Sequence, residues 1–492
     1  MHPDYDVVIG LEVHVHLATQ AKLFSRCPVA YGGEPNTSVS EICLALPGTL
    51  PVISAEAVRC AVRAGLATHC EVHSCSVFAR KHYFYPDLPK GYQISQFEEP
   101  LATGGYVEIE DPAAPESTRR IRLTRIHMEE DAGKSIHDSA LAGSDATLID
   151  LNRAGVPLIE IVSEPDLASP EEAAAYLRSL HRTLRYASVS VADMERGQFR
   201  CDANVSLRPH GDTTLGTRTE IKNLNSFRSV EFALHAEIRR QADVLDSGGS
   251  VVQATMGYDV DRDRTFVMRT KENSDDYRYF PDPDLIPLQL PEAMIEEIRA
   301  SLPELPAERR ARFASQYGLS DYDAGVLTNA RVLAELFEDT LRALPDGAPL
   351  EKRAKTVANW LARDVLAALR DRELEVEESR LSPEALAELI DLVESGALTA
   401  KNARELVPEL VTSGGSPKAL VRERGLGAVS DSATLEPIID GVLAEHPEAI
   451  ASFHEGEAKS LNFLMGQVMR KTGGKANAAE VRALLLSKLE SS

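Results

Sequence analysis

Three residues able to bind a metal ion or move a proton alternate near the N-terminus: Glu12, His14 and His16. Side chains alternate between the two faces of a β-strand, so these three would share one face of a strand over residues 10–17. The leucines and valines between them would share the opposite face, which must then be buried. A half-solvated strand of an antiparallel sheet gives the same pattern, so this stretch alone leaves both interpretations open.

A second candidate is the stretch 127–134, which holds three consecutive carboxylates, Glu129, Glu130 and Asp131. Adjacent carboxylates repel one another unless positive charge lies among them. A wet surface turn would tolerate such a run. Its place directly after the alternating strand pattern of residues 121–126 instead favours a site at a strand end.

Glu160 is a single carboxylate inside an apolar run, residues 158–162, that indicates a buried strand. Burying a carboxylate costs on the order of several kcal/mol unless it is paired or bound to a metal. Glu160 could therefore be a metal ligand or one half of a buried ion pair, with Arg153 as a nearby partner. This stretch does not choose between the two.

Two further stretches, residues 200–208 and 220–225, alternate polar and apolar side chains. Asp202 and Asn204 share one strand face in the first stretch, and Lys222 belongs to the polar face of the second. Two strands with polar faces suggest a polar cleft rather than only a wet sheet.

Together these stretches supply an oxygen-rich set of ligands with one imidazole: Glu12, His14, Glu130 and Glu160. Hard oxygen ligands suit Mg²⁺ or, alternatively, Mn²⁺. Basic residues that could hold phosphates accompany them: Lys81, Lys90, Lys134, Arg153 and Lys222. Such a set fits metal-assisted phosphoryl transfer, in which positioning and charge neutralisation supply most of the catalysis.

The expected site therefore has two sets of residues. The catalytic set is Glu12, His14, Glu130, Glu160, Lys134 and Arg153. The nucleotide-binding set is Lys81, Lys90, Lys222, Asn152, Asp202 and Asn204. The segment 133–135 looks like the end of a phosphate-binding P-loop, but Met128 stands where that motif needs a glycine.

The elements that must position these residues fall into two regions. Up to about Leu290 the chain is dense in strand signals, with one helix opened by a capping box at Ser169 and another over about 226–245. After the segment 302–306, which holds two prolines, the pattern is helical almost to the end. The fold class is therefore α+β, with boundaries near residues 291 and 380.

The 492 residues carry a formal net charge of -23 and six scattered cysteines. Such a chain lacks the basic surface that sequence-blind nucleic-acid binding needs, so a polyanionic substrate would meet a bound cation or a few placed Lys and Arg. The cysteines fit reduced thiols. Neither a membrane-spanning run nor a signal peptide is recognisable, so we expect a cytoplasmic protein that has no membrane partner.

Five motifs connect these clusters, at residues 5–14, 83–96, 127–134, 150–161 and 274–281. Together they closely resemble the family of B subunits of the bacterial tRNA-dependent amidotransferases, GatCAB. The resemblance covers essentially the whole chain, and the long motif over 150–161 is specific to that family.

The resemblance implies a fold of three parts: a strand-rich catalytic cradle domain (1–291), a helical linker domain (292–380) and a helical tail like the YqeY proteins (381–492). It also implies a heterotrimer. An A subunit would release ammonia from glutamine, and a small C subunit would wrap the A–B contact. The enzyme it implies is a ligase that forms carbon–nitrogen bonds with glutamine as the amide donor.

The resemblance further implies the reaction. ATP phosphorylates the side-chain carboxylate of glutamate or aspartate mischarged onto the tRNA for glutamine or asparagine, and channelled ammonia then displaces the phosphate. In the family, Mg²⁺ is held by residues that correspond here to Glu12, His14, Glu130 and Glu160. Whether Glu-tRNA(Gln), Asp-tRNA(Asn) or both are used stays open. A tRNA-binding scaffold without catalysis is the alternative, and the intact ligand set speaks against it.

The tail would contact the tRNA through basic residues: Lys459, Arg470, Lys471 and Lys475. The same residues could equally be solubilising surface charges.

The chain departs from the family in one respect. Many members carry a four-cysteine zinc knob after the first strand, whereas here only Cys27 and Cys43 remain and Ser25 and Ser40 occupy the partner positions. Two thiols do not close a structural zinc site, so we expect no zinc.

Overall fold

The structure is a computed structural model that describes residues 4–136, 146–224, 226–270, 277–428, 432–454, 457–473 and 475–490. The chain divides into two compact units, Met1–Leu305 and Pro306–Ser492. The first unit contains the expected catalytic and nucleotide-binding residues. Asn225 and the first three residues of the motif at 274–281 lie outside the described residues.

One large sheet forms the frame of the first unit. Its strands are β1 (Tyr5–His16), β2 (Glu71–Val72), β6 (Ala102–Thr103), β7 (Tyr106–Asp111), β8 (Ala114–Glu130), β11 (Pro157–Ser163), β12 (Phe199–Pro209), β13 (Thr219–Leu224), β14 (Ala254–Asp259) and β15 (Arg264–Thr270). The strand order is β15-β14-β13-β12-β1-β11-β8-β6-β2, with β7 paired to β8.

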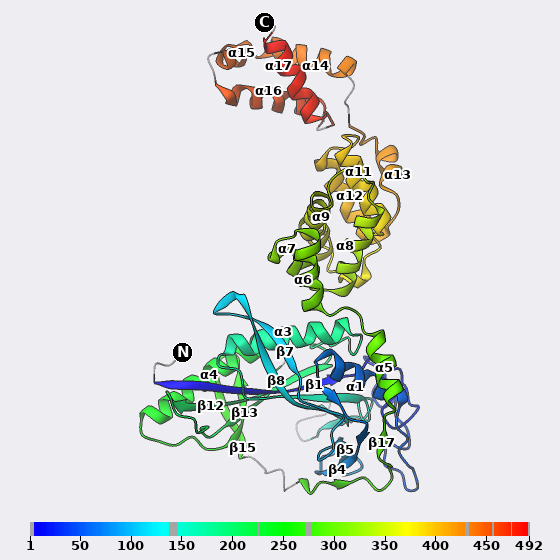
Figure 1. Ribbon diagram of the computed structural model, residues 1–492, viewed down its shortest axis with the longest axis vertical. Coiled ribbons are helices and arrows are strands. Elements are labelled where there is room, and N and C mark those ends of the chain that lie inside the picture. Colours follow the sequence, from blue (N-terminus) through cyan, green and yellow to red (C-terminus); the bar gives the residue numbers. More distant parts are fainter. Residues whose placement is uncertain are drawn as a thin grey trace. The chain divides into compact units, whose positions relative to one another are not determined.

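Strand β1 lies in the middle of this sheet, antiparallel to β11 on one side and to β12 on the other (Figure 1). The prediction of a strand with one buried face is confirmed, because Leu11, Val13 and Val15 are buried. The alternating residues Glu12 and His14 are less buried and lie on the opposite face. The sheet therefore brings together polar residues from distant parts of the chain.

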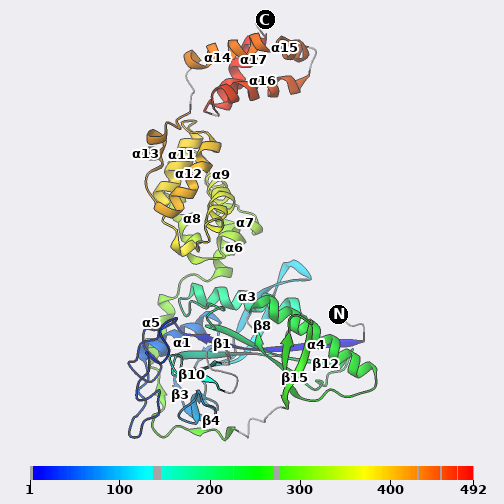
Figure 2. The ribbon, with the colours of Figure 1, turned by 180° about the vertical axis from the view of Figure 1, so that it is seen from behind.

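Helices α3 (Pro170–Tyr186) and α4 (Phe227–Asp246) cover one face of the sheet (Figures 1 and 2). Each begins after a serine whose hydroxyl accepts a backbone hydrogen bond: Ser169 from Glu172 N at 3.1 Å, and Ser226 from Ser229 N at 3.0 Å. Both predicted helices are confirmed. Helix α1 (Ala55–Ala67) and helix α5 (Glu292–Ser301) complete the helices that pack on the same core.

Three small sheets add to the frame. One joins β4 (Phe78–His82), β5 (Tyr92–Gln96) and β16 (Phe280–Pro281), the second joins β9 (Lys134–Ile136) and β10 (Leu148–Asp150), and the third joins β3 (Cys75–Ser76) and β17 (Leu288–Gln289). The first of them carries Lys81 and supplies polar partners to the end of β8.

The second unit is helical, as the sequence predicts. Its helices are α6 (Pro306–Tyr317), α7 (Asp321–Leu327), α8 (Arg331–Ala343), α9 (Leu350–Asn359), a π-helical turn (Trp360–Val365), α10 (Leu366–Arg370), α11 (Pro383–Glu394), α12 (Ala400–Ser413), α13 (Pro417–Arg424), α14 (Ser432–Glu445), α15 (Pro447–His454), α16 (Ala458–Lys471) and α17 (Ala478–Glu490).

The buried residues place the breaks differently from the boundaries expected at 291 and 380. Ile295 and Ile298 of α5 belong to the core of the first unit, so that unit extends to Leu305. In the second unit one core runs from Phe313 to Val411, and a separate one gathers residues 435–489. The residues on either side of 380 thus share a single core.

Candidate active site

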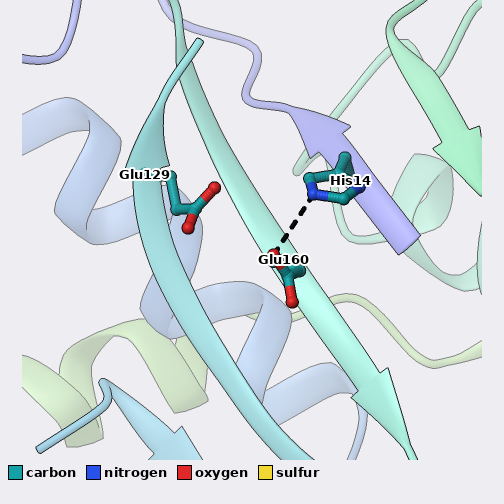
Figure 3. A group of neighbouring side chains, drawn as sticks. All are labelled: His14, Glu129 and Glu160. Atoms are coloured by element: carbon teal, nitrogen blue, oxygen red, sulfur yellow. Dashed lines mark ion pairs between the residues drawn. The ribbon is translucent and has the colours of Figure 1, made fainter. Parts of the chain in front are cut away.

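His14 and Glu160 face each other across the central strand pair (Figure 3). Strands β1 and β11 are antiparallel with these two residues in register, so their side chains share one face of the sheet. His14 Nε2 lies 3.2 Å from Glu160 Oε2. The partner of Glu160 is therefore a histidine and not Arg153, the ion-pair partner considered from the sequence.

Glu129 completes a group of three possible metal ligands with His14 and Glu160 (Figure 3). One donor atom from each of the three lies within 4.8 Å of the others. Strand β8 supplies Glu129 and pairs with β11, where His127 is in register with Glu160. His127 Nε2 lies 3.2 Å from Glu129 Oε1 and 3.7 Å from Glu160 Oε2, so it stands between the two carboxylates.

The structure places Glu129 in this group, where the sequence led us to expect Glu130. Adjacent strand residues point to opposite faces, and the Glu130 carboxylate instead contacts Lys90 and accepts a hydrogen bond from Ile94 N at 3.0 Å. A signal for the correct face exists in the sequence. Ile126 and Met128 are buried apolar residues, and their alternation assigns His127 and Glu129 to the polar side.

Polar residues of β5 hold the Glu129 carboxylate in place. Ser95 Oγ donates to Glu129 Oε1 at 2.6 Å, and Gln93 Nε2 donates to Oε2 at 3.0 Å. These bonds fix the orientation of the carboxylate in the way that outer partners orient metal ligands.

The buried charges of this group stabilise one another. Burial acts to raise the pKa of Glu160, but His127 and His14 hold it well below its usual range. Burial likewise opposes the charge of Glu129, and Lys81 together with His127 lowers its pKa. Burial tends to lower the pKa of His14, yet the hydrogen bond to Glu160 raises it. Both carboxylates are therefore ionised at neutral pH and can act as ligands.

Glu12 lies beside this group and not within it. Its carboxylate accepts a hydrogen bond from Asn204 Nδ2 at 2.9 Å. Burial, and then the nearby charges of Glu160, Glu220 and Asp202, raise its pKa. Glu12 therefore sits in a region that is rich in negative charge.

Lys81 projects toward the two carboxylates from β4. Burial opposes its charge, but Glu129 and, more weakly, Glu160 raise its pKa, so the ammonium stays charged. Its Nζ lies 5.0 Å from the centre of the Tyr277 ring, which adds a cation–π contact. Lys81 is the basic residue of the expected set that is coupled most directly to the ligand group.

Arg153 contacts Asp131 in a second buried network. Asp131 Oδ2 lies 3.5 Å from Arg153 Nε, 2.8 Å from Arg200 Nη2 and 2.7 Å from His16 Nε2. Burial acts to raise the pKa of Asp131, but the two guanidinium groups and His16 hold it far below its usual range. Tyr31 lies 3.0 Å from the other ring nitrogen of His16. His16 thus belongs to this network and not to the ligand group.

The remaining polar residues on β12 and β13 pair with one another. Lys222 Nζ lies 2.9 Å from Asp202 Oδ2 and 3.4 Å from Glu220 Oε1. Burial opposes its charge, but Asp202 and Glu220 raise its pKa. Asn204 Oδ1 is a buried oxygen with no hydrogen-bond partner in the part of the chain that the structure describes.

Two residues of the expected set serve other purposes or stand apart. Asn152 is buried and holds a loop, because its Oδ1 accepts from Ser38 N at 2.8 Å and its Nδ2 donates to Glu34 O at 2.8 Å. Lys134 is exposed on β9. The structure brings neither side chain into contact with the ligand group.

Cys27 and Cys43 have different neighbours. Cys27 Sγ lies 3.8 Å from Ser38 Oγ, whereas Cys43 Sγ lies 3.2 Å from Ser40 Oγ and 3.4 Å from Lys22 Nζ. Neither cysteine belongs to a metal-ligand group among the described residues.

The donors at the ligand group fit a hard divalent cation. Two ionised carboxylates and one imidazole supply oxygen and nitrogen atoms close enough to share one ion. Lys81 adds positive charge on the same side. The arrangement can bind a cation and an anionic group next to each other.

No helix among the described residues combines the length and the apolarity that crossing a bilayer requires.

Comparison with known proteins gives consistent matches along the chain. Residues 7–296 match the family described as "GatB/GatE catalytic domain", and residues 335–489 match "GatB domain". Three similar proteins are each named as the B subunit of an aspartyl/glutamyl-tRNA(Asn/Gln) amidotransferase. Their sequences are 52% identical in Oleidesulfovibrio alaskensis, 49% in Moorella thermoacetica and 49% in Thermosynechococcus vestitus. The alignments cover 99% of this chain and 99%, 100% and 96% of those proteins, respectively.

Proposed function

Because the chain belongs to the GatB family of tRNA-dependent amidotransferase subunits, we propose that its His14–Glu129–Glu160 group is the centre that activates the aminoacyl side chain. The chain is thus a subunit of a glutamine-dependent ligase of translation. The substrates we propose are Glu-tRNA(Gln) and Asp-tRNA(Asn). The partners we propose are a glutaminase A subunit and a C subunit.

The observation that carries this proposal is the convergence of two buried carboxylates and an imidazole from three different strands. The two carboxylates lie beside His127 and His14, and their pKa values are lowered, so both carry charge at neutral pH. Two ionised carboxylates this close to each other attract a cation. We propose Mg²⁺ as the ion, held by His14, Glu129 and Glu160. When bound, it would neutralise the phosphate of ATP and the attacking carboxylate, two anions that otherwise repel.

The residues around the group have separate tasks in this proposal. Ser95 and Gln93 keep the Glu129 carboxylate oriented. Lys81 stays charged and offers its ammonium to an oxygen of the transferred phosphate. Glu12 lies outside the ligand group, and we assign it an electrostatic effect on Glu160 rather than a place among the ligands.

The test is an amidation assay with both mischarged tRNAs, the A and C subunits, ATP and Mg²⁺. The matched variant is Glu160→Gln, which keeps the shape of the side chain and removes its charge. We expect the native chain to form ADP and amide only when Mg²⁺ is present, and the variant to bind tRNA but form neither product. If Glu160→Gln formed ADP at the native rate, the assigned centre would be wrong, and if the native chain bound tRNA but formed no ADP, the chain would be a tRNA-binding scaffold.

A further inference from the structure

A lysine ammonium and a thiol lie side by side inside the first unit, away from the ligand group. Lys22 is 1% exposed and Cys43 is 7% exposed. Lys22 Nζ lies 3.4 Å from Cys43 Sγ. It also donates to Ser38 O at 2.6 Å and lies 3.5 Å from Leu151 O.

This ammonium has no carboxylate partner in the described part of the chain. An isolated ammonium is costly to bury, and its usual partner is an acid. The groups around Lys22 Nζ are two carbonyl oxygens and one sulfur. The sulfur is thus the only reactive group that the amine touches there.

The sulfur is fixed in position as well. Ser40 Oγ donates to Cys43 Sγ at 3.2 Å, and Sγ donates to Ala154 O at 3.4 Å. An amine and a thiol that are held together in this way can be coupled by oxidation, because the first oxidation product of a thiol is a sulfenic acid, which carries an oxygen on the sulfur that the amine contacts.

We propose that Lys22 and Cys43 are a modification site, where peroxide forms a covalent bridge of nitrogen, oxygen and sulfur. The first peroxide oxidises the thiol to S–OH and leaves as one water. Lys22 releases its extra proton to solvent and enters as the amine. The second peroxide removes one hydrogen from S–OH and one from the amine as the N–O bond closes, and leaves as two waters. The chain gains one oxygen and loses two hydrogens.

The observed separation favours the bridged product over a direct nitrogen–sulfur bond. An oxygen placed between the atoms needs less movement from 3.4 Å than a single bond would. Both side chains are anchored, Lys22 by Ser38 O and Cys43 by Ser40 and Ala154. Large movements would break these contacts.

The bridge would connect to the candidate active site through one segment. Leu151 and Ala154 contact the pair, and Arg153 lies between them in the chain. Arg153 donates to Gly133 O at 2.6 Å and lies 3.5 Å from Asp131. Oxidation of the pair would therefore restrict the segment that positions Arg153.

The experiment treats the full chain with hydrogen peroxide and measures intact mass and cross-linked peptides. We expect a gain of about 14 Da that maps to Lys22 with Cys43 and is reversed by dithiothreitol. Cys27→Ser is the matched control and should keep the gain, since no amine touches Cys27 in the described residues. Cys43→Ser and Lys22→Arg should abolish it.

Three outcomes would overturn the proposal. One is a gain of about 32 Da on Cys43 alone, the mass of a sulfinic acid. The second is a loss of about 2 Da, which indicates a direct nitrogen–sulfur bond. The third is an unchanged 14 Da gain in Cys43→Ser. Cys43→Ser is nearly isosteric, so it decides the matter even if Lys22→Arg fails to fold.

Discussion

Replacing Glu129 and Glu130 one at a time should show which of the two adjacent glutamates is the metal ligand. We expect Glu129→Gln to weaken Mg²⁺ binding strongly and Glu130→Gln to leave it unchanged. Only Glu129 offers an oxygen to the group with His14 and Glu160, whereas Glu130 faces Lys90 and Ile94 N. The two variants differ by one position and make the same chemical change, so each is the control for the other.

The size of the effect follows from the charge removed. At about 4 Å and an effective dielectric constant of about 20, a unit charge and a divalent ion interact by about 8 kcal/mol. Most of this interaction energy is recovered in the variant, because water and the amide oxygen of the substituted glutamine can still bind the ion. Loss of even an outer-shell partner costs about 10–100-fold in metal affinity. We therefore expect the Mg²⁺ half-saturation concentration to rise about 100-fold in Glu129→Gln, or about 3 kcal/mol.

The assay is ADP formation with mischarged tRNA over a series of Mg²⁺ concentrations. Glu130→Gln is expected to change the maximum rate through its contact with Lys90, but not the half-saturation concentration. Thermal unfolding of both variants checks that the fold is intact. If Glu130→Gln required the higher Mg²⁺ concentration and Glu129→Gln did not, the assignment of faces along β8 would be refuted.

Three further perturbations test the surroundings of the site. Asp131→Asn should lower the free energy of unfolding at pH 7 by about 1–3 kcal/mol, because it removes the buried charge that Arg153 and Arg200, both partly exposed, contact. The native pKa of Asp131 is lowered from 3.8, so the stabilisation that its charge provides is complete above about pH 4 and is lost on acidification. Urea unfolding should therefore show a smaller difference in unfolding free energy between the native chain and the variant below about pH 4 than at pH 7. Ile161→Ala should cost about 2–5 kcal/mol, since the side chain is 0% exposed, and a urea-measured loss below about 1 kcal/mol would contradict the core packing. Metal analysis should find no tightly held zinc at Cys27 and Cys43, and one zinc per chain would overturn that expectation.

The strand and helix patterns were predictable because they depend on neighbouring residues. The buried face of β1 follows from the alternation of Leu11 with Glu12, and α3 follows from the capping serine Ser169. Both signals are local, so the sequence contains them in full. The α+β class follows from the same signals.

The composition of the ligand group was only partly predictable. His14 and Glu160 stand out because each is a polar residue inside an apolar strand. The choice between Glu129 and Glu130 depends on which residues of β8 share a sheet face with Glu160 of β11. The apolar alternation in β8 shifts by one residue between Leu123 and Ile126, where the register with β11 also shifts between Val162 and Ser163. Counting alternate residues from Ile121 therefore places Glu130, and not Glu129, on the polar face.

The contacts of Lys22 and Lys81 could not be predicted at all. Lys22 contacts Ser38 and Cys43, and Lys81 interacts electrostatically with Glu129 of β8 and Glu160 of β11, across separations that no local pattern records. Such contacts depend on the register of strands that are distant in the chain. A lysine in the sequence is otherwise indistinguishable from a surface charge.

The central position of β1 has a consequence for synthesis on the ribosome. Its partners begin at Pro157 and Phe199, so after its own last residue, His16, the first strand made waits about 140 residues for the partner of one edge and about 180 for the partner of the other. At a translation rate of about 5–20 residues per second, the first wait lasts about 7–30 s and the second about 10–40 s. Until then a strand with one apolar face and at least one open edge can pair with another nascent chain. We therefore expect newly made chains to need chaperone protection until β12 has emerged.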